Sequence, residues 1–129
     1  MYKKLTILFL TIIISTAFFI SCSDDDGTTP PPDLEITITS PNGGEIWYAY
    51  TAQTITWEDN IDGNVNIYLT DMVTFVEGIS LGTESDGSFE YNIPSNVPTG
   101  SNLKISVVSV DDDNIGDFSD ENLEVLSSP

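Results

Sequence analysis

Beyond residue 34, apolar and polar residues alternate in short runs that are separated by clusters of turn-forming residues. Alternation with a period of two is typical of strands with one buried face, and no window shows a sustained helical period. The predicted strands are residues 35–39, 46–48, 53–57, 64–69, 72–81, 88–93, 102–110 and 122–126. The pattern therefore predicts an all-β domain.

The spacing of these strands favours one architecture. Turns every 8 to 12 residues are typical of an antiparallel β-sandwich of about seven strands, in the immunoglobulin or fibronectin III manner. We expect this sandwich to span residues 35–127, with Trp57 filling the space between its sheets. The segment 72–81, which is apolar on both sides of Gly78, is predicted as one bent strand or two short ones at a sheet edge.

The first 21 residues follow a different pattern. Lys3 and Lys4 precede an apolar run over residues 5–20, and a small residue stands before Cys22. This is the layout of a signal peptide. The run has 16 residues and is interrupted by Thr and Ser, whereas a membrane-spanning helix needs roughly 20. A signal peptide over residues 1–21 is therefore favoured over a transmembrane anchor.

Cys22 is the only cysteine of the chain, so it cannot form an internal disulfide. Ile20, Ser21 and Cys22 resemble the lipobox of bacterial lipoproteins, although Phe19 stands where Leu is usual. The resemblance implies cleavage before Cys22, a lipid on its sulfur and acylation of its new amino group, as in palmitate-bearing lipoproteins. Two or more acyl chains hold a protein firmly on a membrane, whereas one binds reversibly. Plain secretion is the alternative.

Residues 22–34 are predicted to be a disordered linker. After Cys22 the segment is acidic and then rich in proline, which favours an extended, semi-rigid spacer. Asp24, Asp25 and Asp26, directly after the lipidated cysteine, resemble surface-export signals of some Gram-negative lipoproteins of the Bacteroidetes type. The resemblance implies an outer-membrane protein exposed on the cell surface, and the periplasmic face is the alternative.

Charge limits the partners. The chain has a net formal charge of −18, and removal of residues 1–21 leaves Lys104 alone against 21 acidic residues, a net charge of −20. Nucleic acids and anionic lipid headgroups require a positive patch and are therefore excluded as partners. Cations, cationic partners and neutral glycans remain. The chain contains no His or Arg, so it lacks the commonest general base and the planar phosphate clamp.

Two clusters are candidate binding sites. Trp47, Tyr48 and Tyr50 are candidate glycan-binding aromatics, although on a strand Tyr48 and Tyr50 would face opposite to Trp47, so one set is expected in the core. The acidic loop that contains Asp111, Asp113, Asp117 and Asp120 is a candidate calcium site. The loop does not fit an EF-hand, because Ile115 takes a ligand position and Asn122 replaces the bidentate Glu. A solvated acidic turn is favoured, and no cofactor other than the lipid is predicted.

No catalytic constellation is evident. A pair of carboxylates could cleave a glycoside, but 21 acidic residues supply so many pairs that none stands out. A small sandwich with short turns also offers little concave surface for an active site. We therefore predict that the protein is not an enzyme.

Several short motifs, in order, resemble one family. They are Ser40-Pro41-Asn42-Gly43-Gly44-Glu45, Trp47, Thr54-Ile55-Thr56-Trp57, Asp86-Gly87-Ser88, Ile93-Pro94, Gly100, Lys104-Ile105 and Asp117-Phe118-Ser119-Asp120. Together they resemble the KRE/KNH-like domain, also called the Ser-Thr-rich glycosylphosphatidylinositol-anchored membrane family, over residues 35–126. Tyr91 and Ala49-Tyr50 depart from the usual pattern.

The resemblance implies an Ig-like β-sandwich of the kind found in fungal wall proteins and bacterial surface proteins. It also implies a non-catalytic module that binds carbohydrate or the cell envelope, or serves in adhesion. The alternative is an accessory or structural subunit of an envelope complex that binds a protein through the edge at residues 72–82.

Overall fold

The computed structural model describes residues 31–128. The predicted signal peptide, Cys22 and most of the predicted linker lie outside the described residues. Residues 32–128 form one compact unit that contains every strand of the described residues and their buried core. Soluble protein that begins at Ser23 therefore keeps the whole folded unit.

The described residues form an all-β domain, as the alternation predicted. Its nine strands are β1 (Ile36–Ser40), β2 (Ile46–Tyr48), β3 (Ala52–Asp59), β4 (Asn64–Thr70), β5 (Phe75–Glu84), β6 (Ser88–Asn92), β7 (Gly100–Ser109), β8 (Gly116–Phe118) and β9 (Leu123–Leu126). Residues 31–128 contain no helix that could cross a membrane.

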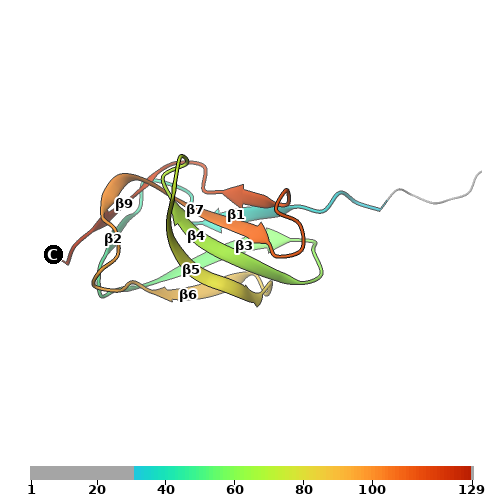
Figure 1. Cartoon of the computed structure of the whole chain (residues 1–129), viewed down its shortest axis with the longest axis horizontal. Helices are drawn as coiled ribbons and strands as arrows, with labels where there is room; N and C mark the ends of the chain where they lie inside the picture. The colour runs from blue at the N-terminus through green and yellow to red at the C-terminus, as the bar shows by residue number, and fades with distance from the viewer. Residues whose placement is uncertain (1–30, 129) are drawn as a thin grey trace, which may run out of the picture. The chain divides into compact units, whose positions relative to one another are not determined.

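The strands form the two sheets of a sandwich (Figure 1). One sheet has the order β1-β3-β6, and the other has the order β2-β9-β7-β4-β5 with β8 paired to β7. The predicted segment 72–81 is a single edge strand, β5, with several register shifts against β4. Such bulges bend an edge strand.

Two features differ from the predicted antiparallel sandwich of about seven strands. The strand β8 lies where a turn was expected, because three residues are too few to show an alternating pattern. The pair of β2 and β9 is parallel. These strands lie at opposite ends of the domain sequence, so no hairpin fixes their relative direction.

The core is built from the inward-facing positions of both sheets. Ile55, Ile67 and Ile105 are fully buried, and Trp57 is 3% exposed. The indole N–H of Trp57 donates to Asp59 Oδ2 (2.8 Å) and to Ser85 Oγ (3.0 Å). Trp57 therefore fills the space between the sheets, as predicted, and its buried N–H group is hydrogen-bonded.

Polar contacts join the two sheets along both open sides of the sandwich. On one side, the main-chain N–H of Ile38 in β1 donates to Asp117 Oδ2 in β8, at 2.8 Å. On the other, the hydroxyl of Tyr91 in β6 donates to Glu77 Oε1 in β5, at 3.5 Å. The other carboxylate oxygen of Glu77 is buried and has no hydrogen-bond partner in the described part of the chain. These contacts connect edges of the two sheets that are not joined by strand pairing.

The contact between Tyr91 and Glu77 predicts a pH dependence of stability. Burial, together with the charge of Glu77 and its hydrogen bond, raises the pKa of Tyr91 from 10.0 to about 12. Between these values the unfolded chain has released the proton while the folded domain keeps it, so the free energy of unfolding falls as pH rises. We expect this fall in urea denaturation series, and we expect Tyr91→Phe to reduce it. An equal fall in Tyr91→Phe would contradict this role for Tyr91.

Candidate functional site

The aromatic residues predicted to bind glycan do not form one surface. Trp47 is 3% exposed and packs in the core with its ring centroid 6.2 Å from that of Tyr91. Tyr48 is half-buried, and Tyr50, which follows β2, is 75% exposed. A buried ring cannot stack on a sugar, so the assignment of Trp47 to a glycan-binding surface is corrected to a core role. Tyr50 alone of the three presents an open ring.

The acidic loop stabilises the fold rather than gathering its carboxylates. Asp117 accepts the N–H of Ile38, and Asp120 Oδ2 accepts the amide of Asn42 at 2.9 Å. Asp111 and Asp113 are exposed. Within residues 31–128, no three Asp, Glu, His or Cys side chains are arranged to hold a metal ion. The loop therefore offers no preformed calcium site.

The turn at residues 40–45 is also structural. The carboxylate of Glu45 accepts the N–H groups of Asn42 (2.9 Å) and Gly43 (2.8 Å). The side-chain oxygen of Asn42 accepts the N–H of Asp120 at 3.0 Å. The motif at residues 40–45 and the motif at residues 117–120 thus hydrogen-bond to each other. These contacts account for the residue types of both motifs, and no ligand is needed to explain them.

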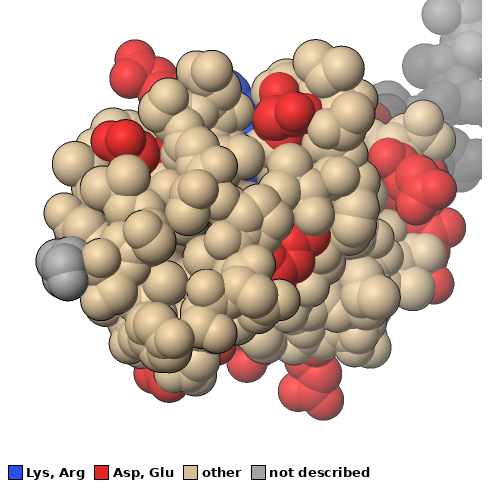
Figure 2. Space-filling model, turned by 60° about the vertical axis from the view of Figure 1, so that its left-hand side comes forward, with Lys and Arg blue, Asp and Glu red and all other residues tan. Residues whose placement is uncertain are grey.

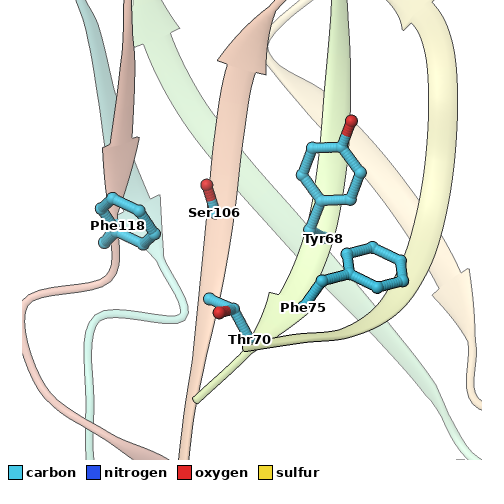
Figure 3. Close-up of a pocket in the computed structure, with 5 residues that line it drawn as sticks. All are labelled: Tyr68, Thr70, Phe75, Ser106 and Phe118. Atoms are coloured by element: carbon cyan, nitrogen blue, oxygen red, sulfur yellow. The ribbon is translucent and has the colours of Figure 1, made fainter. Parts of the chain in front are cut away.

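A shallow groove lies on the outer face of the larger sheet, and the residue-level predictions missed it. It has a volume of about 210 Å³ and is lined by Tyr68, Thr70, Phe75, Ser106 and Phe118. We call these five residues the aromatic groove. Figure 3 shows Tyr68 and Phe75 on one side of Ser106, and Phe118 on the other.

Three residues of the aromatic groove form a row across adjacent strands. Ser106 in β7 pairs directly with Tyr68 in β4 and with Phe118 in β8. Paired residues of neighbouring strands point to the same face of a sheet. A small residue therefore stands between two aromatic walls, and it leaves the groove open above itself.

Two hydroxyl groups of the aromatic groove are unengaged. Ser106 is 3% exposed, and neither its hydroxyl nor that of Tyr68 has a hydrogen-bond partner within residues 31–128. The hydroxyl of Thr70, in contrast, donates to the carbonyl of Thr74 at 2.9 Å. The Ser106 hydroxyl is not among the buried polar atoms without a partner; it opens on the aromatic groove, where water or a ligand can reach it.

The wall formed by Tyr68 and Phe75 is held in place by the turn before β5. The two rings pack edge to face, with centroids 5.5 Å apart. In the turn, Asp71 Oδ1 accepts the N–H groups of Val73 (2.9 Å) and Thr74 (2.6 Å). These hydrogen bonds, with that of Thr74 first, lower the pKa of Asp71. The turn is thus fixed by its own polar groups, directly before Phe75.

No charged residue lines the aromatic groove. Carboxylates are scattered over the face seen in Figure 2 and leave broad uncharged areas between them. Lys104, the one basic residue of residues 31–128, donates to the carbonyls of Ser119 (2.9 Å) and Asp120 (2.8 Å). The described surface therefore has no positive patch for a polyanion.

Some signals of the aromatic groove exist in the sequence. Tyr68 and Ser106 occupy the outward positions of their predicted strands, so the alternation already places an aromatic ring and a small hydroxyl residue on an outer face. Phe118 lies outside every predicted strand, so the sequence could not predict its position beside Ser106. The row depends on pairing between three segments that are distant in sequence.

Residues 40–121 match the profile of the Kre9/KNH-like N-terminal Ig-like domain. The chain belongs to this family. The predicted resemblance is thereby confirmed for the domain, and Ig-like domains of this kind are generally non-catalytic.

Among solved structures, the chain is similar to the fibronectin(III)-like modules of Clostridium thermocellum CbhA. The identity is 18%, the alignment covers 73% of this chain and 99% of that chain, and the TM-score is 0.47. The comparison with curated proteins gives no match.

Proposed function

We propose that this protein is a lipid-anchored, non-catalytic module that binds an uncharged polysaccharide at the cell envelope. The observation that carries the proposal is the aromatic groove, in which open rings flank hydroxyl groups that have no partner in the described chain. The family assignment is consistent with a binding or adhesion module.

The chemistry of sugars matches that of the aromatic groove. A pyranose ring has apolar C–H faces and a rim of hydroxyl groups, so it gains from aromatic surface and from free hydrogen-bonding groups together. An acidic polysaccharide would approach a chain whose net charge is −18. Among residues 31–128 it would find no free cation, because the ammonium group of Lys104 already donates to two main-chain carbonyls. An uncharged polysaccharide is therefore favoured.

Affinity electrophoresis tests the binding. Soluble protein that begins at Ser23 is run through gels that contain a neutral polysaccharide (glucan, mannan or xylan) or an acidic one (polygalacturonate). We expect retardation in at least one neutral gel and none in the acidic gel. Unchanged mobility in every neutral gel would refute the proposed function.

Cys22 is proposed as the point of attachment, with the domain displayed on the outer surface of the outer membrane. Replacement Cys22→Ser removes the sulfur that carries lipid, and we expect the protein to move from the membrane fraction to the soluble fraction. The expected effect is large, because multiple acyl chains anchor a protein almost irreversibly. Fractionation and immunoblotting measure it, with Ser21→Ala as a neighbouring control. A variant that stays with the membrane would contradict lipid anchoring at Cys22.

Protease treatment of intact cells separates the two membrane faces. Display on the surface predicts that the domain is shed from intact cells by external protease. A periplasmic location predicts cleavage only after the outer membrane is permeabilised.

A protein partner is the second candidate. Along and before the edge strand β5, Met72, Val73 and Leu81 are 55%, 88% and 70% exposed. Exposed apolar residues beside a free strand edge favour protein contacts. However, the bulges between β4 and β5 disturb that edge, which makes simple strand addition unfavourable. Pull-down from solubilised envelope, compared between wild type and Leu81→Ser, tests this candidate.

A further inference from the structure

We propose that the side-chain amide of Asn42 is a site of spontaneous deamidation that folding controls. Two carboxylates, those of Glu45 and Asp120, hold the amide and its neighbour unreactive in the folded domain, and unfolding releases them. The converted residue then destabilises the turn at residues 40–45. This modification is independent of the proposed polysaccharide binding.

Asn42 differs from the other asparagines of the chain in the residue that follows it. It precedes Gly43, whereas each of the other eight precedes Val, Leu or Ile. Deamidation begins when the main-chain nitrogen of the following residue loses its proton and attacks the side-chain carbon Cγ of asparagine. A branched side chain on that residue hinders the approach, whereas glycine leaves it open. The sequence therefore directs deamidation to Asn42.

The reaction consumes only water and releases ammonia. A bond forms between Gly43 N and Asn42 Cγ, the bond between Cγ and Nδ2 breaks, and Nδ2 leaves as ammonia with the proton that Gly43 gave up. Water then opens the resulting five-membered succinimide to aspartate or isoaspartate. In both products a carboxylate replaces the neutral amide, so the chain gains one negative charge.

The folded domain holds the attacking nitrogen in its protonated form. The N–H of Gly43 donates to Glu45 Oε2 at 2.8 Å, and the N–H of Asn42 donates to Glu45 Oε1 at 2.9 Å. Loss of the Gly43 proton would place a negative nitrogen against a carboxylate and break a charge-assisted hydrogen bond. Asn42 itself is exposed, so this protection comes from hydrogen bonding and not from burial.

The folded domain also holds the amide that is attacked. Asn42 Nδ2 donates to Asp120 Oδ2 at 2.9 Å, and the N–H of Asp120 donates to Asn42 Oδ1 at 3.0 Å. The attack converts the planar carbon Cγ to a tetrahedral one, which moves both Oδ1 and Nδ2. Both hydrogen bonds therefore oppose the reaction.

The products do not fit the place of the amide. In the aspartate product a carboxylate oxygen replaces Asn42 Nδ2 and faces Asp120 Oδ2, so a donor is lost and two like charges meet. In the isoaspartate product one more carbon atom enters the main chain beside Gly43, where an added Cβ atom would already overlap with Glu121. Both products therefore weaken the contact between this turn and the segment that contains Asp120 and Glu121.

The rate of conversion in folded and unfolded protein tests the control by folding. Soluble protein that begins at Ser23 is incubated at mildly alkaline pH, in buffer or in guanidinium chloride above its unfolding transition, and its peptides are followed by mass spectrometry. A synthetic peptide of residues 38–47 in both solutions corrects for the effect of guanidinium on the chemistry. We expect conversion at Asn42 to be at least about tenfold slower in the folded protein, because it proceeds only through the small open population. Equal rates, or faster conversion at another asparagine, would overturn the proposal.

Variants separate the two carboxylates from general stability. Glu45→Ala and Asp120→Ala remove hydrogen-bond acceptors of the Asn42-Gly43 pair, and each should speed conversion in the folded protein by about fivefold. Asp71→Ala is the matched control, because Asp71 also accepts two main-chain N–H groups, in the turn before β5. Circular dichroism checks that each variant is folded. An equal increase in Asp71→Ala would show that only general stability matters and would overturn the role of the two carboxylates.

Asn42→Asp measures the effect of the converted residue. We expect its equilibrium constant for unfolding, from urea denaturation at neutral pH, to be about tenfold larger than that of the wild type, because two carboxylates then face each other. The difference should shrink as acid protonates these groups. Stability equal to that of the wild type at neutral pH would overturn the destabilisation of the turn by the conversion.

Discussion

Replacement of Gly43 by alanine is expected to lower the free energy of unfolding by about 2–5 kcal/mol, because it adds steric overlap to backbone strain. A Cβ atom on Gly43 would overlap with Glu121 Cβ and lie 2.9 Å from Glu121 Cα, and the residue has φ of 128°. The overlap is with backbone and Cβ atoms, which cannot rotate away. The turn that contains Gly43 must therefore move away from the segment that contains Glu121.

That movement would break several hydrogen bonds at once. The N–H of Glu121 donates to the carbonyl of Asn42 at 3.2 Å, and the N–H of Gly44 donates to the carbonyl of Asn122 at 2.9 Å. These bonds connect the turn before β2 to the segment before β9, and β2 and β9 then pair with each other. We therefore expect Gly43→Ala to weaken the pairing of β2 with β9 as well.

The neighbouring glycine supplies a matched control. Gly44 also has positive φ, at 80°, but a Cβ atom there meets nothing within 4 Å. Gly44→Ala should cost only about 1–2 kcal/mol, from backbone strain. Urea denaturation of the soluble protein from Ser23 onward measures both variants. Equal losses in the two variants would show that the contact with Glu121 is unimportant.

The strands that the sequence predicts are those with regular alternation. Ile36 and Ile38 in β1, Ile55 and Trp57 in β3, and Ile67 in β4 are buried, and polar residues separate them along each strand. Burial of one face forces this alternation, so it can be read without knowledge of the partners. The fold class therefore follows from local pattern alone.

The candidate site could not be predicted from local alternation. Tyr68, Ser106 and Phe118 become neighbours through the pairing of β7 with both β4 and β8. Register between strands distant in sequence depends on the whole packed domain, and β8 is too short to be recognised locally. For Trp47, Tyr48 and Tyr50 the alternation predicted that one set lies in the core but not which one, and the structure places Trp47 there.

Replacement of Trp57 by alanine is the second change with a large expected effect. The side chain is 3% exposed and lies among the buried residues that both sheets contribute. Truncation removes buried apolar contacts and leaves a cavity, which for Trp→Ala costs about 3–5 kcal/mol. Because a domain of this size is stable by about 5–15 kcal/mol, the variant should unfold at much lower urea concentration.

Trp57→Phe separates packing from hydrogen bonding at the same position. Phenylalanine keeps most of the buried ring but loses the N–H that donates to Asp59 (2.8 Å) and Ser85 (3.0 Å). Ser85 still donates to Asp59, so the carboxylate keeps a partner, and the expected loss is only about 1–2 kcal/mol. Urea denaturation followed by the fluorescence of Trp47 measures both variants on one scale. If Trp57→Phe lowers the free energy of unfolding as much as Trp57→Ala does, the indole hydrogen bonds contribute more than the filling of the core. The role assigned to Trp57 would then be wrong.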